Sequence, residues 1–461
     1  MSTPRTDSIP GMKVTVMGLG LNGGGLASAR FFAQRGAVVS VTDTRDETIL
    51  KPSIDALAGL PIRFVLGRHE TTDFSSADLV IKNPAVRPDS EYLKAAARVE
   101  TDLSVFLTFC TAPIVAITGS KGKSTTASAT AHALNACGIK AHLGGNITRS
   151  PLDFIDEVEA SDRVVLELSS WQLGDLKGRG LLRPLAAVLT RIVPDHQDRY
   201  GSMEAYVSDK RLIYADQKPG NWTICDADDE YGRSFASETR GSVLWYGNKL
   251  PADGFGVNIL PDGSCIASLP ELDDIEILPA KVILPGAHNH RNLAAAAAAA
   301  WCSGANPVEL GQALAGFGGV EHRLEVFAEY AGVRWCNDSA ATVPQSTAAA
   351  LSAFDDPIIL ITGGTDKQLD FSPVREAYRR ASAIILLAGT GTDKLRILLD
   401  EDGIPYEGPY TDFKEALRRA DSLARSGSIV VLSPGCTSFG MFRNEFDRGN
   451  SFKREATLLH S

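Results

Sequence analysis

Two glycine-rich segments, each lying between a β-rich run and a stretch of helical composition, constrain this chain more than any other feature of its sequence. The first is Gly18-Leu-Gly-Leu-Asn-Gly23, which follows the run 13–17. The second is Thr118-Gly-Ser-Lys-Gly-Lys-Ser-Thr125, which follows the run 114–117. A strand that turns through glycines directly into a helix is the opening unit of a parallel α/β sheet. We therefore predict two successive α/β domains, each with a ligand site where its strands end.

The length and the later runs add a third domain. At roughly 100 to 200 residues per domain, 461 residues suffice for about three. Buried-strand candidates at 358–361, 383–387 and 429–432 alternate with helical stretches. We predict a Rossmann-like N-terminal domain over 1–102, a central P-loop ATPase-like domain over 103–319 and a C-terminal Rossmann-like α/β domain over 320–461. Within the central domain we expect an antiparallel insertion from about 221 to 282, then a closely packed helix over 288–301 that contains seven consecutive alanines.

Composition excludes several classes of function. The 46 lysines and arginines stand against 56 aspartates and glutamates, a formal net charge of −10, which disfavours non-specific binding to nucleic acid or anionic lipid. No stretch approaches the roughly 18 apolar residues of a membrane span, and the polar N-terminus lacks a signal-peptide core. Seven scattered cysteines without a CxxC pair indicate neither disulfides nor zinc. We therefore expect a cytoplasmic protein that acts on small molecules. A monomer is also expected, although composition does not bear on the oligomeric state.

The first loop has the GxGxxG spacing of a nucleotide site. Asp43 lies 20 residues beyond Gly23, where the second strand ends, which alone is the dinucleotide fingerprint. Thr44 and Arg45 follow it and suit a base or a ribose as readily as a dinucleotide. The pattern therefore predicts a nucleotide or sugar-nucleotide site, with the simple alternative that the glycines only permit a tight turn.

The second loop has the GK[ST] end of a phosphate-binding loop but lacks its usual first glycine, since Ile117 stands there. Its glycines still let backbone N–H groups face phosphates, at the N-terminus of a helix. Lys123 can reach the β- and γ-phosphates, and Ser124 can ligate Mg²⁺. We predict that ATP is bound here, by Gly119, Ser120, Lys121, Gly122, Lys123, Ser124 and Thr125.

Further motifs follow in a fixed order. They are Gly145-Asn146, Leu166-Glu-Leu-Ser-Ser-Trp-Gln172, Asp195-His-Gln-Asp-Arg-Tyr200, His288-Asn289, His322-Arg-Leu-Glu325, Asn337-Asp-Ser339, Gly363-Gly364, Asp370-Phe-Ser-Pro373 and Ser433-Pro-Gly-Cys-Thr-Ser438. With the two loops, this order resembles the Mur ligases, ATP-dependent amide ligases of peptidoglycan precursor synthesis, over nearly the whole chain. The resemblance is greatest to the branch that adds glutamate to UDP-N-acetylmuramoyl-L-alanine. It implies an acyl phosphate intermediate, made when the γ-phosphate of ATP passes to the substrate carboxylate.

The resemblance also implies roles for individual residues. Catalytic roles fall on Lys123, Glu167, His196 and Lys210. Two Mg²⁺ ions would be held by Ser124, Glu167, His196 and a carbamylated Lys210. An unperturbed lysine has a pKa of about 10.4, so its reaction with CO₂ needs a strongly lowered pKa. The UDP-sugar residues would be Asn22, Asp43, Thr44, Arg45, Asn83, Asn146, Ser169, Gln172 and His196. Adenine, ribose and phosphate of ATP would also meet Asn292, Arg323 and Asp338, and glutamate would meet Thr342, Lys367 and Ser438.

The glutamate end departs from the pattern of the family. Ala340 stands where the family has lysine, and Glu445 where it usually has an aromatic residue. Losing a cation and gaining a carboxylate beside an acidic substrate changes its pose or its identity. D-glutamate is the default of the family, and an L-glutamate-adding variant is the alternative.

Three more distant functions stay open at this point. An NAD(P) oxidoreductase would use the first loop and Asp43 but leaves the second loop unexplained. A nucleotide switch or partner-binding ATPase would hydrolyse ATP without an amino acid. Another Mur-type ligase, or a folylpolyglutamate synthetase, would share the central domain, but the latter lacks the separate uridine domain that Asp43-Thr-Arg45 indicates.

Overall fold

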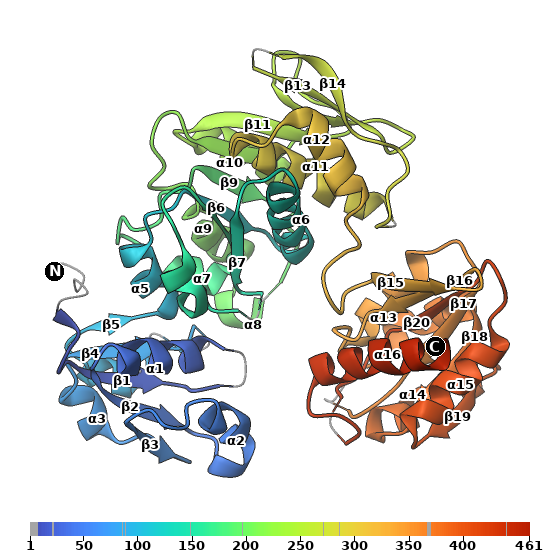
Figure 1. Cartoon of the computed structure of the whole chain (residues 1–461), viewed down its shortest axis with the longest axis horizontal. Helices are drawn as coiled ribbons and strands as arrows, with labels where there is room; N and C mark the ends of the chain where they lie inside the picture. The colour runs from blue at the N-terminus through green and yellow to red at the C-terminus, as the bar shows by residue number, and fades with distance from the viewer. Residues whose placement is uncertain are drawn as a thin grey trace. The chain divides into compact units, whose positions relative to one another are not determined.

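The computed structural model describes residues 8–461 apart from 21–22, 85, 88, 148, 196, 271, 285, 367–369 and 439. The chain divides into two compact units, one formed by Met1–Ala280 with Arg291–Leu314, the other by Lys281–His290 with Ala315–Ser461 (Figure 1). The first unit contains a five-stranded and a nine-stranded sheet, and the second contains a six-stranded sheet. Among the described residues, no helix combines the length and the apolar character needed to cross a bilayer.

The five-stranded sheet is entirely parallel and has the order β3-β2-β1-β4-β5. Its strands are β1 (Lys13–Met17), β2 (Val38–Asp43), β3 (Ile62–Leu66), β4 (Leu79–Lys82) and β5 (Val99–Glu100). Its helices are α1 (Gly24–Gln34), α2 (Glu47–Asp55), α3 (Thr71–Ser75), α4 (Glu91–Ala95) and α5 (Asp102–Phe109). α1 packs on β1, β2 and β4. The chain leaves central β1 first toward β2 and later returns on its other side as β4. In such sheets the connections that follow the two central strands run in opposite directions and leave room for a ligand beyond the strand ends.

The nine-stranded sheet has the order β14-β13-β12-β11-β10-β9-β6-β8-β7. Its strands are β6 (Ile114–Thr118), β7 (Ala141–Gly145), β8 (Arg163–Glu167), β9 (Ala186–Leu189), β10 (Trp222–Asp226), β11 (Ser242–Gly247), β12 (Gly256–Ile259), β13 (Cys265–Leu269) and β14 (Leu272–Leu278). The predicted antiparallel insertion is too broad. β10 pairs in parallel with β9 and with β11, and β11 pairs in parallel with β12. The antiparallel pairs of this sheet among the described residues are β12 with β13 and β13 with β14. The antiparallel strands extend the edge of the same sheet.

Helices and one short 3-10 segment cover the nine-stranded sheet. They are α6 (Lys123–Ala136), η2 (Pro151–Glu157), α7 (Ser170–Asp175), α8 (Gln197–Tyr200), α9 (Met203–Arg211), α10 (Glu230–Glu238), α11 (Ala287–Cys302) and α12 (Pro307–Ala315). The alanines 294–300 of α11 are all fully buried, which confirms that they serve close packing. Methyl side chains let a helix approach its neighbours on every side without losing side-chain entropy.

The six-stranded sheet of the second unit has the order β15-β16-β20-β17-β18-β19, parallel except for the pair β15 and β16. Its strands are β15 (Glu325–Tyr330), β16 (Val333–Asn337), β17 (Ile358–Thr362), β18 (Ala381–Leu387), β19 (Glu407–Tyr410) and β20 (Ile429–Leu432). The remaining elements are α13 (Pro344–Ser352), η3 (Ser372–Arg380), α14 (Thr390–Glu401), α15 (Phe413–Leu423) and α16 (Glu445–Leu459). Separate apolar clusters cover both faces, as a parallel sheet requires. The α/β class with three mainly parallel sheets is confirmed.

Candidate active site

The first glycine loop joins β1 to α1 with very little space between strand and helix. A Cβ atom on Gly25 would lie 2.1 Å from the carbonyl oxygen of Gly18, so no larger residue fits there. α1 begins at Gly24 without a side-chain cap. The first N–H groups of an uncapped helix, together with its dipole, favour an anion. The start of α1 therefore suits an anion, and the nucleotide site predicted for this loop stays a prediction.

Asp43 ends β2 and organises this loop. Its carboxylate is 2% exposed and accepts hydrogen bonds from Gly20 N at 3.2 Å and from Arg45 N at 3.0 Å and Nε at 3.1 Å. Burial raises the pKa of Asp43, but these hydrogen bonds and the charge of Arg45 outweigh burial, so its pKa lies below the ordinary value. Thr44 is exposed beside it. Asn22, a predicted neighbour, lies outside the described residues.

The second glycine loop joins β6 to α6 and contacts a distant helix. Gly122 has φ 91°, and a Cβ atom there would lie 2.3 Å from Asn292 Oδ1 of α11. Lys123 opens α6 and donates from Nζ to Ser120 O at 3.1 Å. Ser124 is buried behind it in the first turn. The loop thus brings four of the predicted ATP residues, Ser120, Gly122, Lys123 and Ser124, close to Asn292, while Lys121 is exposed and Thr125 partly so.

Lys210 of α9 contacts the backbone of the same loop with its side chain. Its side chain is 1% exposed, and Nζ donates to Gly119 O at 2.8 Å and lies 4.5 Å from the Tyr206 ring centre. Burial, and then the charge of Lys123, lower the pKa of Lys210 to about 7, although nearby carboxylates including Asp195 oppose the shift. A large part of this amine is therefore neutral near neutral pH, which is the condition that carbamylation requires.

Glu167 ends β8 with one carboxylate oxygen satisfied and one not. Asn146 Nδ2 donates to Oε1 at 2.9 Å, whereas the buried Oε2 has no hydrogen-bond partner within the described part of the chain. A buried carboxylate oxygen without a donor fits a cation. His196, its predicted co-ligand, lies outside the described residues. Among the described residues, no group of three His, Cys, Asp or Glu side chains forms a metal cluster, so the metal ligands stay a prediction.

One cavity of about 410 Å³ is lined by several of the predicted site residues. From the five-stranded sheet and the start of α5 it is lined by Gly24, Asn83, Pro84 and Asp102. From the nine-stranded sheet and its helices it is lined by Lys123, Gly145, Asn146, Ser150, Ser169, Ser170, Trp171, Gln172, Asp195, Tyr206 and Lys210. Predicted UDP-sugar residues and predicted catalytic lysines thus open onto one space. Asp43, Thr44 and Arg45 do not line it.

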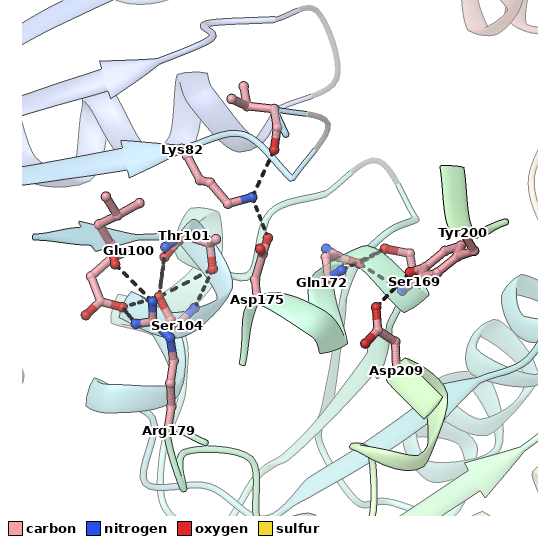
Figure 2. Close-up of polar contacts among 12 residues, drawn as sticks. Lys82, Glu100, Thr101, Ser104, Ser169, Gln172, Asp175, Arg179, Tyr200 and Asp209 are labelled. Carbon is pink, nitrogen blue, oxygen red and sulfur yellow. Dashed lines mark hydrogen bonds and ion pairs between the residues drawn. The ribbon is translucent and has the colours of Figure 1, made fainter. Parts of the chain in front are cut away.

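Ser169 and Gln172 line the cavity and also cap α7. Gln172 N donates to Ser169 Oγ at 3.2 Å, and Ser169 N donates back to Gln172 Oε1 at 3.0 Å (Figure 2). This capping box fixes both side chains. A substrate would therefore meet polar groups whose positions are already set.

Polar contacts tie the five-stranded sheet to the helices of the nine-stranded sheet. Lys82 Nζ of β4 lies 2.7 Å from Asp175 Oδ2 of α7, with both side chains nearly buried (Figure 2). Glu100 pairs with Arg179 in the same view. These contacts hold the two walls of the cavity together.

In the second unit, Asp338 is the most perturbed predicted residue. It accepts hydrogen bonds from Ser433 Oγ at 2.6 Å and Leu324 N at 3.1 Å. Burial raises its pKa to about 7, against these hydrogen bonds and the charge of Arg323. Arg323 lies between two residues with left-handed backbone, His322 and Leu324. Arg323 therefore lies in a strained turn, and Asp338 is joined to that turn through the Leu324 N–H.

Two of the three predicted glutamate residues, Thr342 and Ser438, lie on segments that a backbone hydrogen bond joins. Gly435 N donates to Ala341 O at 2.9 Å, which links the segment that carries Thr342 to the one that carries Ser438. Ser438 is buried and Thr342 half-buried. Lys367 lies outside the described residues, so the structure does not place it. Arg448, 1% exposed, donates to Ser339 O at 2.8 Å and to Cys436 O at 3.2 Å, and thus bridges both segments.

Several residues of the site were missed by sequence reasoning. Tyr206 precedes Lys210 by four residues, so helical spacing could have placed both on one face. Its hydroxyl lies 2.9 Å from Ser120 Oγ. Asp102, Ser150 and Arg448 carry no comparable signal, because a polar residue in a helix first turn or a turn looks the same whether it is exposed or lines a cavity.

Comparisons with known protein families match all three parts of the chain. The Mur ligase MurD-like N-terminal domain matches residues 12–104, the Mur ligase middle domain residues 117–300, and the Mur ligase glutamate ligase domain residues 322–436. A Roseiflexus sp. (strain RS-1) protein named UDP-N-acetylmuramoylalanine--D-glutamate ligase is 43% identical, with 97% of this chain and 98% of that protein covered. A Treponema pallidum (strain Nichols) protein of the same name is 39% identical, with 98% of each covered.

Solved structures agree at the level of the fold. The crystal structure of UDP-N-acetylmuramate-alanine ligase MurC from Thermotoga maritima has a TM-score of 0.60 at 18% identity and covers 97% of this chain and 100% of its own. A crystal structure of MurF from Acinetobacter baumannii has a TM-score of 0.58 at 14% identity, covering 98% and 94%. At these identities the likeness establishes a shared fold.

Proposed function

The chain belongs to the Mur ligase family, and on that premise we propose that it joins glutamate to UDP-N-acetylmuramoyl-L-alanine with ATP in peptidoglycan precursor synthesis. The observation that supports this most is the single cavity, which places an uncapped helix and Asn83 from one sheet beside Lys123 and Lys210 from the other. A nucleotide-sugar with a terminal carboxylate is long enough to lie along such a space and to present that carboxylate to the phosphate loop.

The reaction has two steps that conserve atoms and charge. A carboxylate oxygen of the nucleotide-sugar attacks the γ-phosphorus of ATP, ADP leaves, and an acyl phosphate forms. The amine of glutamate then attacks the acyl carbon, inorganic phosphate leaves, and the nitrogen gives up a proton. Lys123 and the backbone N–H groups at the start of α6 offset the negative charge that develops on the transferred phosphoryl group. Asn146, Ser169 and Gln172 orient the muramoyl part.

Mur ligases use ATP with Mg²⁺, and the chain has residues that fit the ion. We assign it to Ser124 and Glu167, with His196 and a carbamylated Lys210 completing two sites. When bound, Mg²⁺ would supply positive charge to the phosphates. Carbamylation would join the neutral Lys210 amine to CO₂ through a new N–C bond, with loss of one proton. The buried Glu167 Oε2 and the buried Lys210 amine support this assignment. Enrichment with ¹³CO₂ should give a carbamate carbon signal in wild type that is absent in Lys210→Arg.

The remaining assignments follow the same premise. Asn22, Asp43, Thr44, Arg45 and Asn83 would bind the uridine diphosphate, and Asn292, Arg323 and Asp338 the far side of ATP. Thr342, Lys367 and Ser438 would bind glutamate. We further propose a cytoplasmic monomer with domains over 1–102, 103–319 and 320–461.

D-glutamate is the proposed amino acid, because the relatives at 39 and 43% identity are named D-glutamate ligases. Ala340 and Glu445 keep L-glutamate as the alternative. Purified protein with ATP, Mg²⁺ and UDP-N-acetylmuramoyl-L-alanine should release phosphate when one enantiomer is added. Turnover with L-glutamate alone would select the variant, and turnover with neither would overturn the proposal. Binding of NADH, or ATP hydrolysis independent of an amino acid, would favour the oxidoreductase or the switch ATPase.

A further inference from the structure

Asp102 lines the cavity, yet none of the roles above accounts for it. It is the first residue of α5 and is 6% exposed. Ser150 Oγ donates to its Oδ2 at 2.8 Å, whereas Oδ1 is buried and has no hydrogen-bond partner in the part of the chain that the structure describes. Leaving a carboxyl oxygen buried and unsatisfied is costly. A proton, a ligand or both would complete it.

The carboxyl group abuts the N-terminus of α1. A Cβ atom on Gly24 would lie 3.2 Å from Asp102 Oδ2. α1 is 11 residues long and begins without a side-chain cap, so its first N–H groups attract a negatively charged ligand to this place. An ionised Asp102 beside a bound phosphate would repel it, and a protonated Asp102 would not.

The cations nearest Asp102 are paired with other carboxylates. Lys82 of β4 acts on it from a distance, but the Lys82 amine lies 2.7 Å from Asp175. Asp153 of η2 adds negative charge and is itself 3.2 Å from Arg30 of α1, with Arg149 also acting on it. No ion pair of Asp102 occurs among the described residues. Burial raises the pKa of Asp102. The Ser150 hydrogen bond, the backbone N–H groups of Leu103 and Asp102 and the charge of Lys82 offset this only in part.

We propose that Asp102 binds the diphosphate of the nucleotide-sugar as a neutral carboxylic acid, donating a hydrogen bond from its protonated oxygen to a phosphate oxygen at the N-terminus of α1. A carboxyl group kept neutral by its surroundings is a known hydrogen-bond donor in enzyme sites. The inference rests on the proposed function, which assigns the nucleotide-sugar to this cavity. Binding then takes up one proton wherever the free carboxyl group is ionised, and affinity falls as the pH rises.

Asp102→Asn tests the proposal because asparagine keeps a donor of the same shape and cannot ionise. The dissociation constant of UDP-N-acetylmuramoyl-L-alanine should be measured by calorimetry from about pH 5 to about pH 9, where its own carboxylate and diphosphate diester stay ionised. In wild type the dissociation constant should rise about tenfold per pH unit above the pKa of the Asp102 carboxyl group. In Asp102→Asn it should be flat and equal to the low-pH value of wild type. Asp102→Ala should bind about tenfold more weakly than wild type at low pH.

Two controls establish whether the proton is taken up at Asp102 itself. Asp156→Asn changes an exposed carboxylate of η2 and should keep the wild-type pH profile. Calorimetry of wild type in two buffers of different ionisation enthalpy should show proton uptake that Asp102→Asn lacks, whereas proton uptake at any other group of the cavity would persist in the variant.

A water molecule bound to an ionised Asp102 would give the opposite results. A crevice of about 10 Å³ beside Lys82 and Asp102 has room for one water at most. If a water satisfies an ionised Asp102, wild type will take up no proton, and Asp102→Asn will keep the wild-type slope or bind weakly at every pH. Each of these outcomes overturns the role of Asp102 while turnover continues. Absence of any binding by wild type would instead remove the proposed function itself.

Discussion

The two glycine loops of the first unit share the same strand-to-helix backbone arrangement but differ in the charged side chains beside them. Both leave a central parallel strand, β1 or β6, and both open an uncapped helix, α1 or α6. Beside the first loop lie the carboxyl groups of Asp102 and of Asp43, the latter paired with Arg45, and beside the second lie the amines of Lys123 and Lys210. Helix N-termini alone attract anions at both loops. The side chains decide whether the bound anion is merely held or also has its developing charge stabilised.

Removing the cation of the second loop should have the largest effect. Lys123→Ala should lower kcat/KM by about 10³-fold, equal to about 4 kcal/mol, because the charge on the transferred phosphoryl group loses its nearest amine. Phosphate release in a coupled assay measures this. Lys177→Ala, at an exposed lysine after α7, is the matched control and should be unaffected. A Lys123→Ala enzyme within about threefold of wild type would show that the two loops do not differ as described.

Breaking the ion pair between the two walls of the cavity should have the next largest effect. Lys82→Met should cost about 3 kcal/mol of unfolding free energy, since it leaves the buried Asp175 carboxylate unpaired. The double variant Lys82→Met with Asp175→Leu should recover part of that loss. Urea unfolding gives both values. Equal losses in the single and double variants would mean that the pair contributes nothing to joining the two walls.

The carboxylate of the first loop should affect binding and leave the chemical step alone. Asp43→Asn weakens the contacts to Gly20 and Arg45, so KM for the nucleotide-sugar should rise about tenfold, equal to about 1.4 kcal/mol, with kcat unchanged. Asp55→Asn, at an exposed carboxylate of α2, is the control. A fall in kcat at unchanged KM would assign the first loop to catalysis and contradict the contrast.

The smallest effect concerns stability and pH. The folded-state pKa of Asp43 is lowered, so its contribution is present above the ordinary value of 3.8 and is lost as pH falls through the lowered pKa. Asp43→Asn should therefore be less stable than wild type by about 1 kcal/mol at neutral pH, a difference that shrinks below about pH 4. Urea unfolding across this range checks the sign, which would be reversed if the carboxylate were a burden on the fold.

Local signals predicted the elements that hold the loops. Short apolar runs bounded by turn residues predict β1 and β20 with the observed bounds, and β6 and β17 to within one residue at the C-terminal end. The parallel pairing of β10 and β11 was misjudged, because the alternation of a half-buried parallel strand is the same as that of an antiparallel one. Sheet partners far apart in sequence decide between the two.

The site divides in the same way. The phosphate loop could be predicted because its glycines and lysine are contiguous in sequence. The buried state of Asp102 and Arg448 could not, since it depends on the Ser150, Ser339 and Cys436 segments that pack around them. The lowered pKa of Lys210 was expected as a requirement of its implied chemistry, and its cause, burial against Gly119 and Tyr206, is tertiary.

The close packing of α11 limits which side chains the second glycine loop and the helix itself can carry. Residues 294–300 have only methyl side chains and are fully buried. A methyl group has no other rotamer to adopt, so a larger side chain at any of these positions could not be accommodated by side-chain rotation. Any thickening would push the helix bodily, and Asn292 at its start already lies where a Cβ on Gly122 would be. The space between α11 and the second glycine loop therefore leaves no room for even one added carbon atom. The alanine run 294–300, although chemically simple, is among the segments least free to accept substitutions.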